Sequence, residues 1–323
     1  MHALGIGRHS RATLPMLKYS LKRLASAVPT LLVLITVAFF LIRVAPGGPF
    51  DAEKALPPEI EANLAAKYHL DEPLVFQYFR YLWQIARFDF GPSFHYRDWT
   101  VNDLIAQGAP VSFTLGFLAL VVAFVIGTTI GCWAAMRQNT RADYTVMATA
   151  MMGISIPSFV MAPLLILLFA IILGWLPAGG WDYSPSRMVL PVVTLALPMI
   201  AYIARITRGS MIEVLHSGFI RTARAKGMPE REVILRHALR PALLPVISYL
   251  GPAAAAILTG SVVIERIFTI PGIGSYFVQG ALNRDYTLVM GVVIFYGVLI
   301  IALNFLVDLL YAWLDPRIRY EDS

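Results

Sequence analysis

The sequence predicts an all-α polytopic membrane protein with six transmembrane helices. Hydrophobic residues make up 58% of the 323 residues and charged residues only 14%, and the mean hydropathy is +0.67. An ordinary soluble domain is roughly half apolar. Six apolar runs that can cross a bilayer as helices alternate with polar loops. They cover about residues 24–42, 108–136, 144–173, 188–204, 243–264 and 286–313.

The first run follows a basic tail and predicts a membrane anchor. The basic residues of this tail are Arg8, Arg11, Lys18, Lys22 and Arg23. The apolar run is longer than the roughly 7–15 apolar residues of a signal peptide. We therefore expect an uncleaved anchor, with a cleaved signal peptide as the alternative.

A polar segment from Pro46 to about Asp103 separates the first two runs. It is rich in proline, aromatic and acidic residues, and two of its stretches are helix-like, Pro58–Tyr68 and Pro73–Phe88. We expect a small folded extracytoplasmic segment. It is either a solvated loop or a surface for an extracellular partner, and the sequence leaves both open.

Small residues and prolines mark the later runs. The second run contains Gly127-Thr-Thr-Ile-Gly131, a spacing of small residues that lets two helices approach closely. Prolines inside the third and fourth runs predict kinks, which are tolerated where a helix lines protein or a cavity. They are Pro157, Pro163, Pro191 and Pro198.

Three features near the ends of the last two runs have an open role. Asp308 is either a functional intramembrane acid or a packing or snorkelling residue near the interface. Glu265 and Arg266 form either an interfacial ion pair or a gate or partner contact. The Pro271-Gly-Ile-Gly274 stretch reads as a turn.

The distribution of positive charge predicts the orientation. Most of the 26 lysines and arginines lie in the two tails and in the two loops that share the side of the N-terminus. Cytoplasmic loops of membrane proteins carry such an excess. We therefore expect both termini in the cytoplasm.

One of these basic loops contains the residues that typically end one helix, form a tight turn and start a second helix. It runs from Glu213 to Arg240. Gly227 is suited to end the first helix in the left-handed conformation, and Pro229 suits the first position of the second. Charged residues match the dipole of the second helix, with acids at its start and bases toward its end. They are Glu230, Glu232, Arg236 and Arg240.

The first helix of this loop is predicted to be amphipathic. Apolar residues recur at helical spacing at Ile212, Leu215, Phe219 and Ala223. Glu213, Arg221 and Arg224 point the other way, and the Ser217–Gly218 pair is a potential break. An amphipathic basic segment between two spans suits docking to a soluble partner.

The sequence lacks the motifs of several enzyme classes. It contains neither a phosphate-binding loop nor an H-E-x-x-H motif. All six histidines fall in tails or loops, so no pair in mid-membrane could ligate a haem, and one cysteine excludes internal disulfides. We expect no catalytic, cofactor or metal site in this chain.

Arg221-Thr-Ala-Arg-Ala-Lys-Gly227, followed by a second helix and Leu-Leu-Pro245, resembles the coupling loop of bacterial ABC-importer permeases. The acidic residue that starts the family pattern is replaced by Arg221. The likeness continues through motifs along almost the whole chain and is to the B-type permease of the oligopeptide/dipeptide importer family. The motifs are Ile42–Phe50, Lys67–Asp71, Asp89–Ser93, Gln138–Tyr144, Ile156–Phe159, Arg205–Met211, Pro271–Gly274, Gly280–Tyr286 and Asp315–Arg319.

The resemblance implies a type I ABC-importer permease core in the bacterial cytoplasmic (inner) membrane. Its partners would be a second homologous permease, two cytoplasmic ATPases that bind ATP and magnesium, and an extracytoplasmic binding protein that delivers oligopeptides. Dipeptides, other small peptides or nickel are alternative substrates. The residues implied to couple to the ATPase are Phe219, Ile220, Arg221, Thr222, Ala223, Arg224, Ala225, Lys226 and Gly227.

The expected organisation has three parts. Residues 1–107 hold the N-terminal tail, the first span and the extracytoplasmic segment. Residues 108–314 form a five-helix core with a coupling loop at 209–240, and residues 315–323 are a cytoplasmic tail. A secondary transporter is a remote alternative. Such a protein would carry ionisable residues at the midplane and repeated broken helices, and this sequence shows neither a charged midplane nor a convincing repeat. An anchor subunit of a membrane enzyme is disfavoured because haem ligands are absent.

Overall fold

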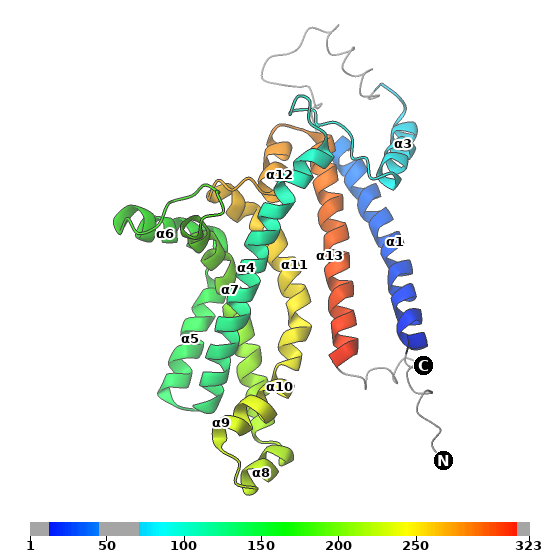
Figure 1. Ribbon diagram of the computed structural model, residues 1–323. Helices are drawn as coiled ribbons and strands as arrows, with labels where there is room; N and C mark the ends of the chain where they lie inside the picture. Colours follow the sequence, from blue (N-terminus) through cyan, green and yellow to red (C-terminus); the bar gives the residue numbers. More distant parts are fainter. Residues whose placement is uncertain (1–12, 45–70, 315–323) are drawn as a thin grey trace, which may run out of the picture. The chain divides into compact units, whose positions relative to one another are not determined.

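The computed structural model describes residues 13–44 and 71–314, with side chains for residues 23, 25–44 and 71–307 (Figure 1). Every element in this part of the chain is helical, which confirms the predicted all-α class. The helix expected at Pro58–Tyr68 lies outside the described residues. The helix expected at Pro73–Phe88 is present as α3, Leu74–Ala86, which directly follows Pro73.

The elements follow the chain in this order: α1 Thr13–Val44, α3 Leu74–Ala86, α4 Val101–Met136, α5 Arg141–Ser155, α6 Ser158–Leu165, the π-helical η1 Ile166–Ile172, α7 Pro185–Leu215, α8 Gly218–Ala225, α9 Glu230–Glu232, the π-helical η2 Val233–Ala238, α10 Leu239–Ala242, α11 Leu244–Ile267, α12 Ile273–Leu282 and α13 Tyr286–Leu314.

Five helices in the described residues are long and apolar enough to cross a membrane: α1, α4, α7, α11 and α13. The third predicted span is a broken one, because α5 and the continuous α6–η1 segment meet at an angle of 102°. The sequence predicted a break at Pro157, and the chain bends there. Ile156 and Pro157 both have extended ψ angles, 117° and 141°, and a residue that precedes proline is disfavoured in the helical region.

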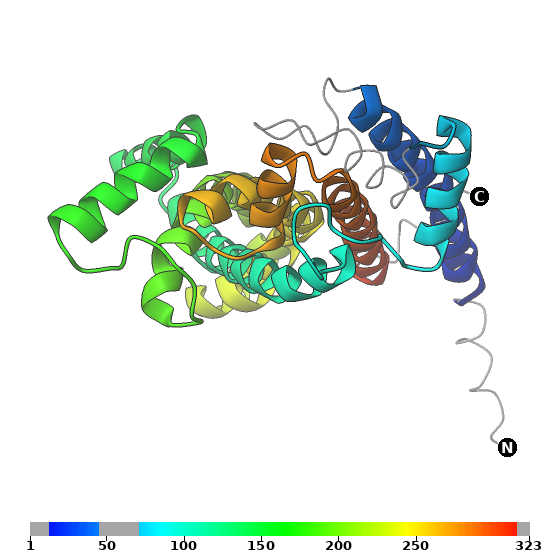
Figure 2. The ribbon, with the colours of Figure 1, turned by 90° about the horizontal axis from the view of Figure 1, so that it is seen from above.

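The helices group into two compact units. Unit 1 contains the described residues up to 103 and from 280 onward, and unit 2 contains residues 104–279. In unit 1, α3 lies beside the C-terminal half of α1 in both views (Figure 1, Figure 2). Phe39 of α1 is fully buried there, in a cluster with Tyr81 of α3 and with Met290 and Ile294 of α13.

In unit 2, α4 packs closely against α7. The two glycines of the predicted small-residue spacing lie at this contact. A Cβ atom on Gly131 would come within 2.5 Å of the Ala204 carbonyl oxygen, and one on Gly127 within 2.9 Å of the Ile200 carbonyl oxygen. These glycines therefore allow the two backbones to approach. The apolar core of the unit continues from α4 through α7 to α11.

Candidate functional site

The basic loop between the fourth and fifth spans, called here the coupling segment, comprises residues 213–240 and lies at one end of the unit 2 helices (Figure 1). The potential break at Ser217–Gly218 is real. The preceding helix α7 ends at Leu215, Ser217 has an extended ψ of 156°, and a separate short helix, α8, begins at Gly218. The segment is thus a helix–break–helix–turn–helix.

Gly227 forms the predicted left-handed turn, with a φ of 77°. Its N–H donates to the Arg224 carbonyl at 3.0 Å, and the next N–H, of Met228, donates to the Ala223 carbonyl at 3.4 Å. A Cβ on Gly227 would meet nothing within 4 Å. The need for glycine is therefore a matter of backbone conformation and not of space.

The second helix of the coupling segment differs in two details from the prediction. Pro229 is the N-cap residue of the helix, with a ψ of 139°, and not its first helical residue. The Pro229 carbonyl accepts hydrogen bonds from the N–H groups of Glu232 and Val233, at 2.9 and 3.1 Å. The helix runs through α9, η2 and α10, so its middle is π-helical. The acidic start and basic end are where the sequence placed them.

The buried face of α8 rests on a small apolar cluster. Ile220 is fully buried, and Ala223 is 8% exposed. The predicted place of Phe219 on the buried face is wrong, because its side chain is 52% exposed. The break at Ser217 restarts the helix, so the apolar spacing does not continue from α7 into α8. The complete cluster, called here the coupling-segment core, contains Ala135, Met211, Ile220, Ala223, Val233, Ala238 and Ala242.

The other side of α8 is exposed and basic. The exposed residues among those expected to couple are Phe219, Arg221, Thr222, Arg224, Ala225, Lys226 and Gly227. The structure therefore brings an exposed aromatic ring and three cationic side chains together on one short helix and its turn. Such a surface can bind an acidic or amphipathic partner.

An ion pair beside this surface connects the two sides of the glycine turn. The sequence analysis did not predict it. The Arg224 guanidinium donates from Nη2 and Nε to the two carboxylate oxygens of Glu230, at 2.6 and 3.1 Å. The hydrogen bonds from Arg224 hold the pKa of the Glu230 carboxyl below its usual value, and the pKa of Arg224 is raised by the same contact. The pair joins α8 to α9.

A buried ion pair links α5 to α7. The sequence analysis did not predict this pair either. Asp143 is fully buried and accepts two hydrogen bonds from Arg208, from Nε and Nη2, both at 2.6 Å. The Asn139 N–H also donates to Asp143 at 3.0 Å. Both residues lie in motifs that carry the family resemblance, so the signal was present, but no local rule pairs residues that are 65 positions apart.

Glu265 is buried and hydrogen-bonded, which removes one of the two alternatives given for Glu265 and Arg266. Its carboxylate accepts the Ser112 hydroxyl at 2.7 Å and the Ser275 N–H at 3.2 Å, so it binds these two residues and not Arg266. The expected ion pair with Arg266 is therefore wrong. The Ser275 contact holds the first turn of α12 against the end of α11. The Pro271–Gly274 stretch, which the sequence predicted to be a turn, spans the end of this connection and the first two residues of α12. The side chain of Asp308 lies outside the described side chains.

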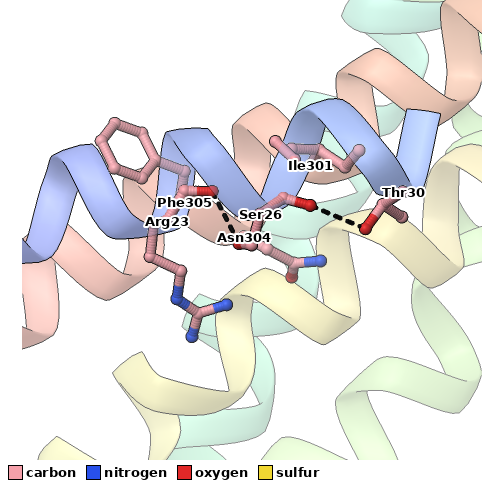
Figure 3. Close-up of a pocket in the computed structure, with 7 residues that line it drawn as sticks. Arg23, Ser26, Thr30, Ile301, Asn304 and Phe305 are labelled. Atoms are coloured by element: carbon pink, nitrogen blue, oxygen red, sulfur yellow. Dashed lines mark hydrogen bonds between the residues drawn. The ribbon is translucent and has the colours of Figure 1, made fainter. Parts of the chain in front are cut away.

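A cavity of about 220 Å³ lies between α1 and α13 in unit 1 (Figure 3). It is lined by Arg23, Ser26, Ala27, Thr30, Ile301, Asn304 and Phe305. The Ser26 and Thr30 hydroxyls donate to carbonyls of their own helix, at 2.8 and 2.9 Å. Ligand sites usually enclose about 300–1,000 Å³, so this cavity is small for a peptide.

Comparison with known families decides what kind of protein this is. The family described as the binding-protein-dependent transport system inner membrane component matches residues 127–320, and the N-terminal region of such components matches residues 16–115. The chain belongs to this family. The permease is thus a multi-pass protein of the inner membrane.

Curated relatives match the permease along their whole length. The oligopeptide transport system permease protein OppB of Salmonella typhimurium is 61% identical over 94% of the permease and 100% of the relative. The protein of the same name from Haemophilus influenzae is 59% identical, with the same coverage. The dipeptide transport system permease protein DppB of Bacillus subtilis is 50% identical over 94% of the permease and 98% of the relative.

Solved structures share the fold of the permease at low sequence identity. The MetNI methionine ABC transporter in inward-facing conformations matches with a TM-score of 0.54 and 20% identity, over 66% of the permease and 96% of that chain. An amino acid ABC transporter matches with a TM-score of 0.52 and 19% identity, over 66% and 94%. The permease therefore has the type I ABC-importer fold that the sequence resemblance implied.

Proposed function

We propose that the permease is the transmembrane subunit of an ATP-driven importer that translocates oligopeptides delivered by an extracytoplasmic binding protein. The support is the family, together with oligopeptide permeases that are 59–61% identical to this chain over their full length. Dipeptides are an alternative substrate, supported by the 50% identical dipeptide permease. Other small peptides or nickel remain further alternatives from the resemblance.

The proposed complex contains this permease, a second homologous permease, two cytoplasmic ATPases and the binding protein. The ATPases would bind ATP and magnesium, and this chain would perform no bond chemistry. The positive charge of the loops supports an arrangement in which both termini and the coupling segment face the cytoplasm. That is the side on which an ATPase would find the basic face of α8.

We propose that residues 219–227 dock into the ATPase. The observation that carries this proposal is the construction of α8. Ile220 and Ala223 anchor the helix on the coupling-segment core, while Phe219, Arg221 and Lys226 remain exposed. A helix that is anchored on one side and exposed on the other can transmit a displacement from the ATPase to the permease, because its buried side moves with the helices on which it packs.

The proposed mechanism is a change between two states of the permease pair. ATP-driven closure of the ATPases would draw the two coupling segments together and open the cavity between the permeases outward; hydrolysis would return it to the inward-facing state. This coupling requires the nucleotide-bound ATPases to bind one permease state more tightly than the other. The contact at α8 is where that difference in affinity would act.

Gly227→Leu tests the docking assignment. A non-glycine residue in the left-handed region costs about 1–2 kcal/mol, a factor of roughly 5–30 in the population of the native turn. Asparagine tolerates this region, so Gly227→Asn is the matched control at the same position. We expect Gly227→Leu, and not the control, to lose co-purified ATPase or to hydrolyse ATP without uptake. The double variant Arg221→Glu with Arg224→Glu should lose co-purified ATPase in detergent.

Normal uptake and normal stimulation of ATP hydrolysis in Gly227→Leu would contradict the coupling role. A separate measurement addresses the importer itself. The tagged permease is purified gently from membranes, and ATP hydrolysis is measured with the binding protein loaded with an oligopeptide, a dipeptide or nickel, or left empty. If the chain purifies without an ATPase, the secondary-transporter alternative must be reopened. If hydrolysis responds to nickel or dipeptides and not to oligopeptides, the substrate assignment is wrong.

A further inference from the structure

Helix α3 presents an exposed face of large apolar side chains. Val75, Phe76, Phe79 and Trp83 are 61%, 65%, 63% and 61% exposed. At 100° per residue they fall on one stripe of the helix. The opposite side of α3 is occupied, because Tyr81 is buried and Tyr78, Leu82 and Ile85 pack in the cluster around Phe39 of α1. We call the exposed stripe the aromatic face.

The contacts between α3 and α1 fix the depth of α3 along a membrane span. The Tyr78 hydroxyl is 2.7 Å from the Thr36 hydroxyl, and the Tyr78 ring lies 5.7 Å from that of Phe40. Thr36 lies inside the apolar span Ala25–Val44. At 1.5 Å per residue it is about 12 Å from the end of α1, in a hydrocarbon core about 30 Å thick. The Tyr78 hydroxyl thus reaches below the end of the span, and α3 cannot stand clear of it.

The aromatic face is also continuous with the apolar surface of α1. On α1, Val33, Val37 and Leu41 are 62%, 50% and 65% exposed, as expected of a span that faces lipid. The rings of Phe40, Tyr78 and Phe79 follow one another at 5.7 and 5.6 Å, from α1 onto α3. Aromatic rings thus join the two surfaces along this path.

The charges beside the aromatic face suit a membrane interface. The Arg87 guanidinium lies 4.4 Å from the centre of the Trp83 ring, and Arg80 pairs with Glu72 at 2.8 Å. Tryptophan and tyrosine concentrate at the level of the lipid headgroups, where one end of the ring is apolar and the other is wet. Arginine next to tryptophan fits the same level, since its guanidinium reaches the phosphates while its stem stays apolar.

We infer that the aromatic face of α3 is a lipid-binding surface: α3 lies in the interfacial region of the bilayer at the C-terminal end of α1, with Val75, Phe76, Phe79 and Trp83 inserted among the lipids. An amphipathic helix in this position binds through its buried apolar area. This assigns the exposed face of α3 to the bilayer, instead of to solvent or to a protein partner. The inference does not depend on the proposed substrate or on the coupling role.

The single cysteine of the chain makes a direct test practical. In a Cys132→Ala background, Phe79→Cys is labelled with a nitroxide, and the whole transporter is reconstituted in lipid nanodiscs. Collisions of the label with oxygen, which concentrates in lipid, are compared with collisions with the water-soluble nickel complex Ni-EDDA. Val37→Cys, on the exposed surface of α1, is the lipid control, and Arg97→Cys, in an exposed loop, is the water control. Val75→Cys repeats the measurement on the same face.

The expected result is a several-fold excess of oxygen over Ni-EDDA collisions at Phe79→Cys and Val75→Cys, as at Val37→Cys. Two other results would overturn the inference. Preference for Ni-EDDA, as expected at Arg97→Cys, would mean that the face is solvated. Low accessibility to both reagents in the assembled transporter, which rises when the permease is separated from its partners, would mean that a protein covers it.

Discussion

Replacing Asp143 with asparagine should lower the thermal stability of the permease more than any comparable change at a surface carboxylate. Asp143 is fully buried, and both of its oxygens accept hydrogen bonds from Arg208 at 2.6 Å. Removing one partner of a buried pair leaves an uncompensated charge and costs about 3–5 kcal/mol. Arg208 keeps 25% of its side chain exposed, and asparagine can still accept the Asn139 N–H, so we expect about 3 kcal/mol, the lower end of this range.

The expected shift in melting temperature follows from the size of unit 2. For domains of 150–250 residues, 1 kcal/mol shifts Tm by about 2–4 °C, so Asp143→Asn should lower it by about 6–12 °C. The assay is the monodisperse fraction of purified permease in detergent after heating. Asp182→Asn is the matched control, because Asp182 also pairs with an arginine, Arg187 at 3.0 Å, but is 54% exposed.

Exposed ion pairs contribute little, so the control should melt close to the wild type. A double variant, Asp143→Asn with Arg208→Gln, separates the pair from the fold around it. If the two residues act through each other, the double variant should lose clearly less than the sum of the single losses. Equal melting temperatures for Asp143→Asn and Asp182→Asn would refute the reasoning, because burial would then make no difference to the value of the pair.

Two further predictions concern the helix contact and the coupling segment. Gly131→Ala should destabilise the permease by about 1–3 kcal/mol, because its Cβ would overlap the Ala204 carbonyl, whereas Gly260→Ala, with nothing within 4 Å, should not; equal melting curves would contradict this. Arg224 depresses the pKa of Glu230, so the stability gained from the pair is present above the ordinary carboxyl pKa and is lost as the pH falls through the depressed value. Because Arg224 and Glu230 are 42% and 56% exposed, the pair contributes at most about 1 kcal/mol. The Tm difference between wild type and Glu230→Gln should therefore be small at neutral pH and vanish in acid, and a difference that does not shrink in acid would argue against the pair.

Local chemistry was enough to predict several features of the coupling segment. Gly227 and Pro229 act on the dihedral angles of their own neighbourhood, so the turn and the start of the second helix could be located from the sequence. The break before α6 was predictable for the same reason, since Pro157 restricts the residue before it. The angle of 102° was not, because its size depends on what the two helices pack against.

Features that join distant residues were beyond the sequence analysis. Phe219 was misplaced because helical spacing was continued across Ser217, and whether a helix continues there depends on how α8 packs on Met211 and Val233. Glu265 was paired with its neighbour in sequence, whereas its partner Ser112 is 153 positions away. In both cases a tertiary contact, and not a local preference, decides where the side chain goes.

One turn of α7 explains how a displacement of the coupling segment could reach the membrane helices. Met211 carries the contact with α8, because it belongs to the coupling-segment core. Arg208, three residues earlier, holds α5 through Asp143, and the residue before it, Thr207, meets Gly131 of α4. Four helices are thus fixed to one another within one turn, and close-packed interiors transmit strain. We infer that α4, α5 and α7 move with α8 as one body. The third span can absorb this motion at the break at Pro157, because the helical hydrogen bonding is already interrupted there.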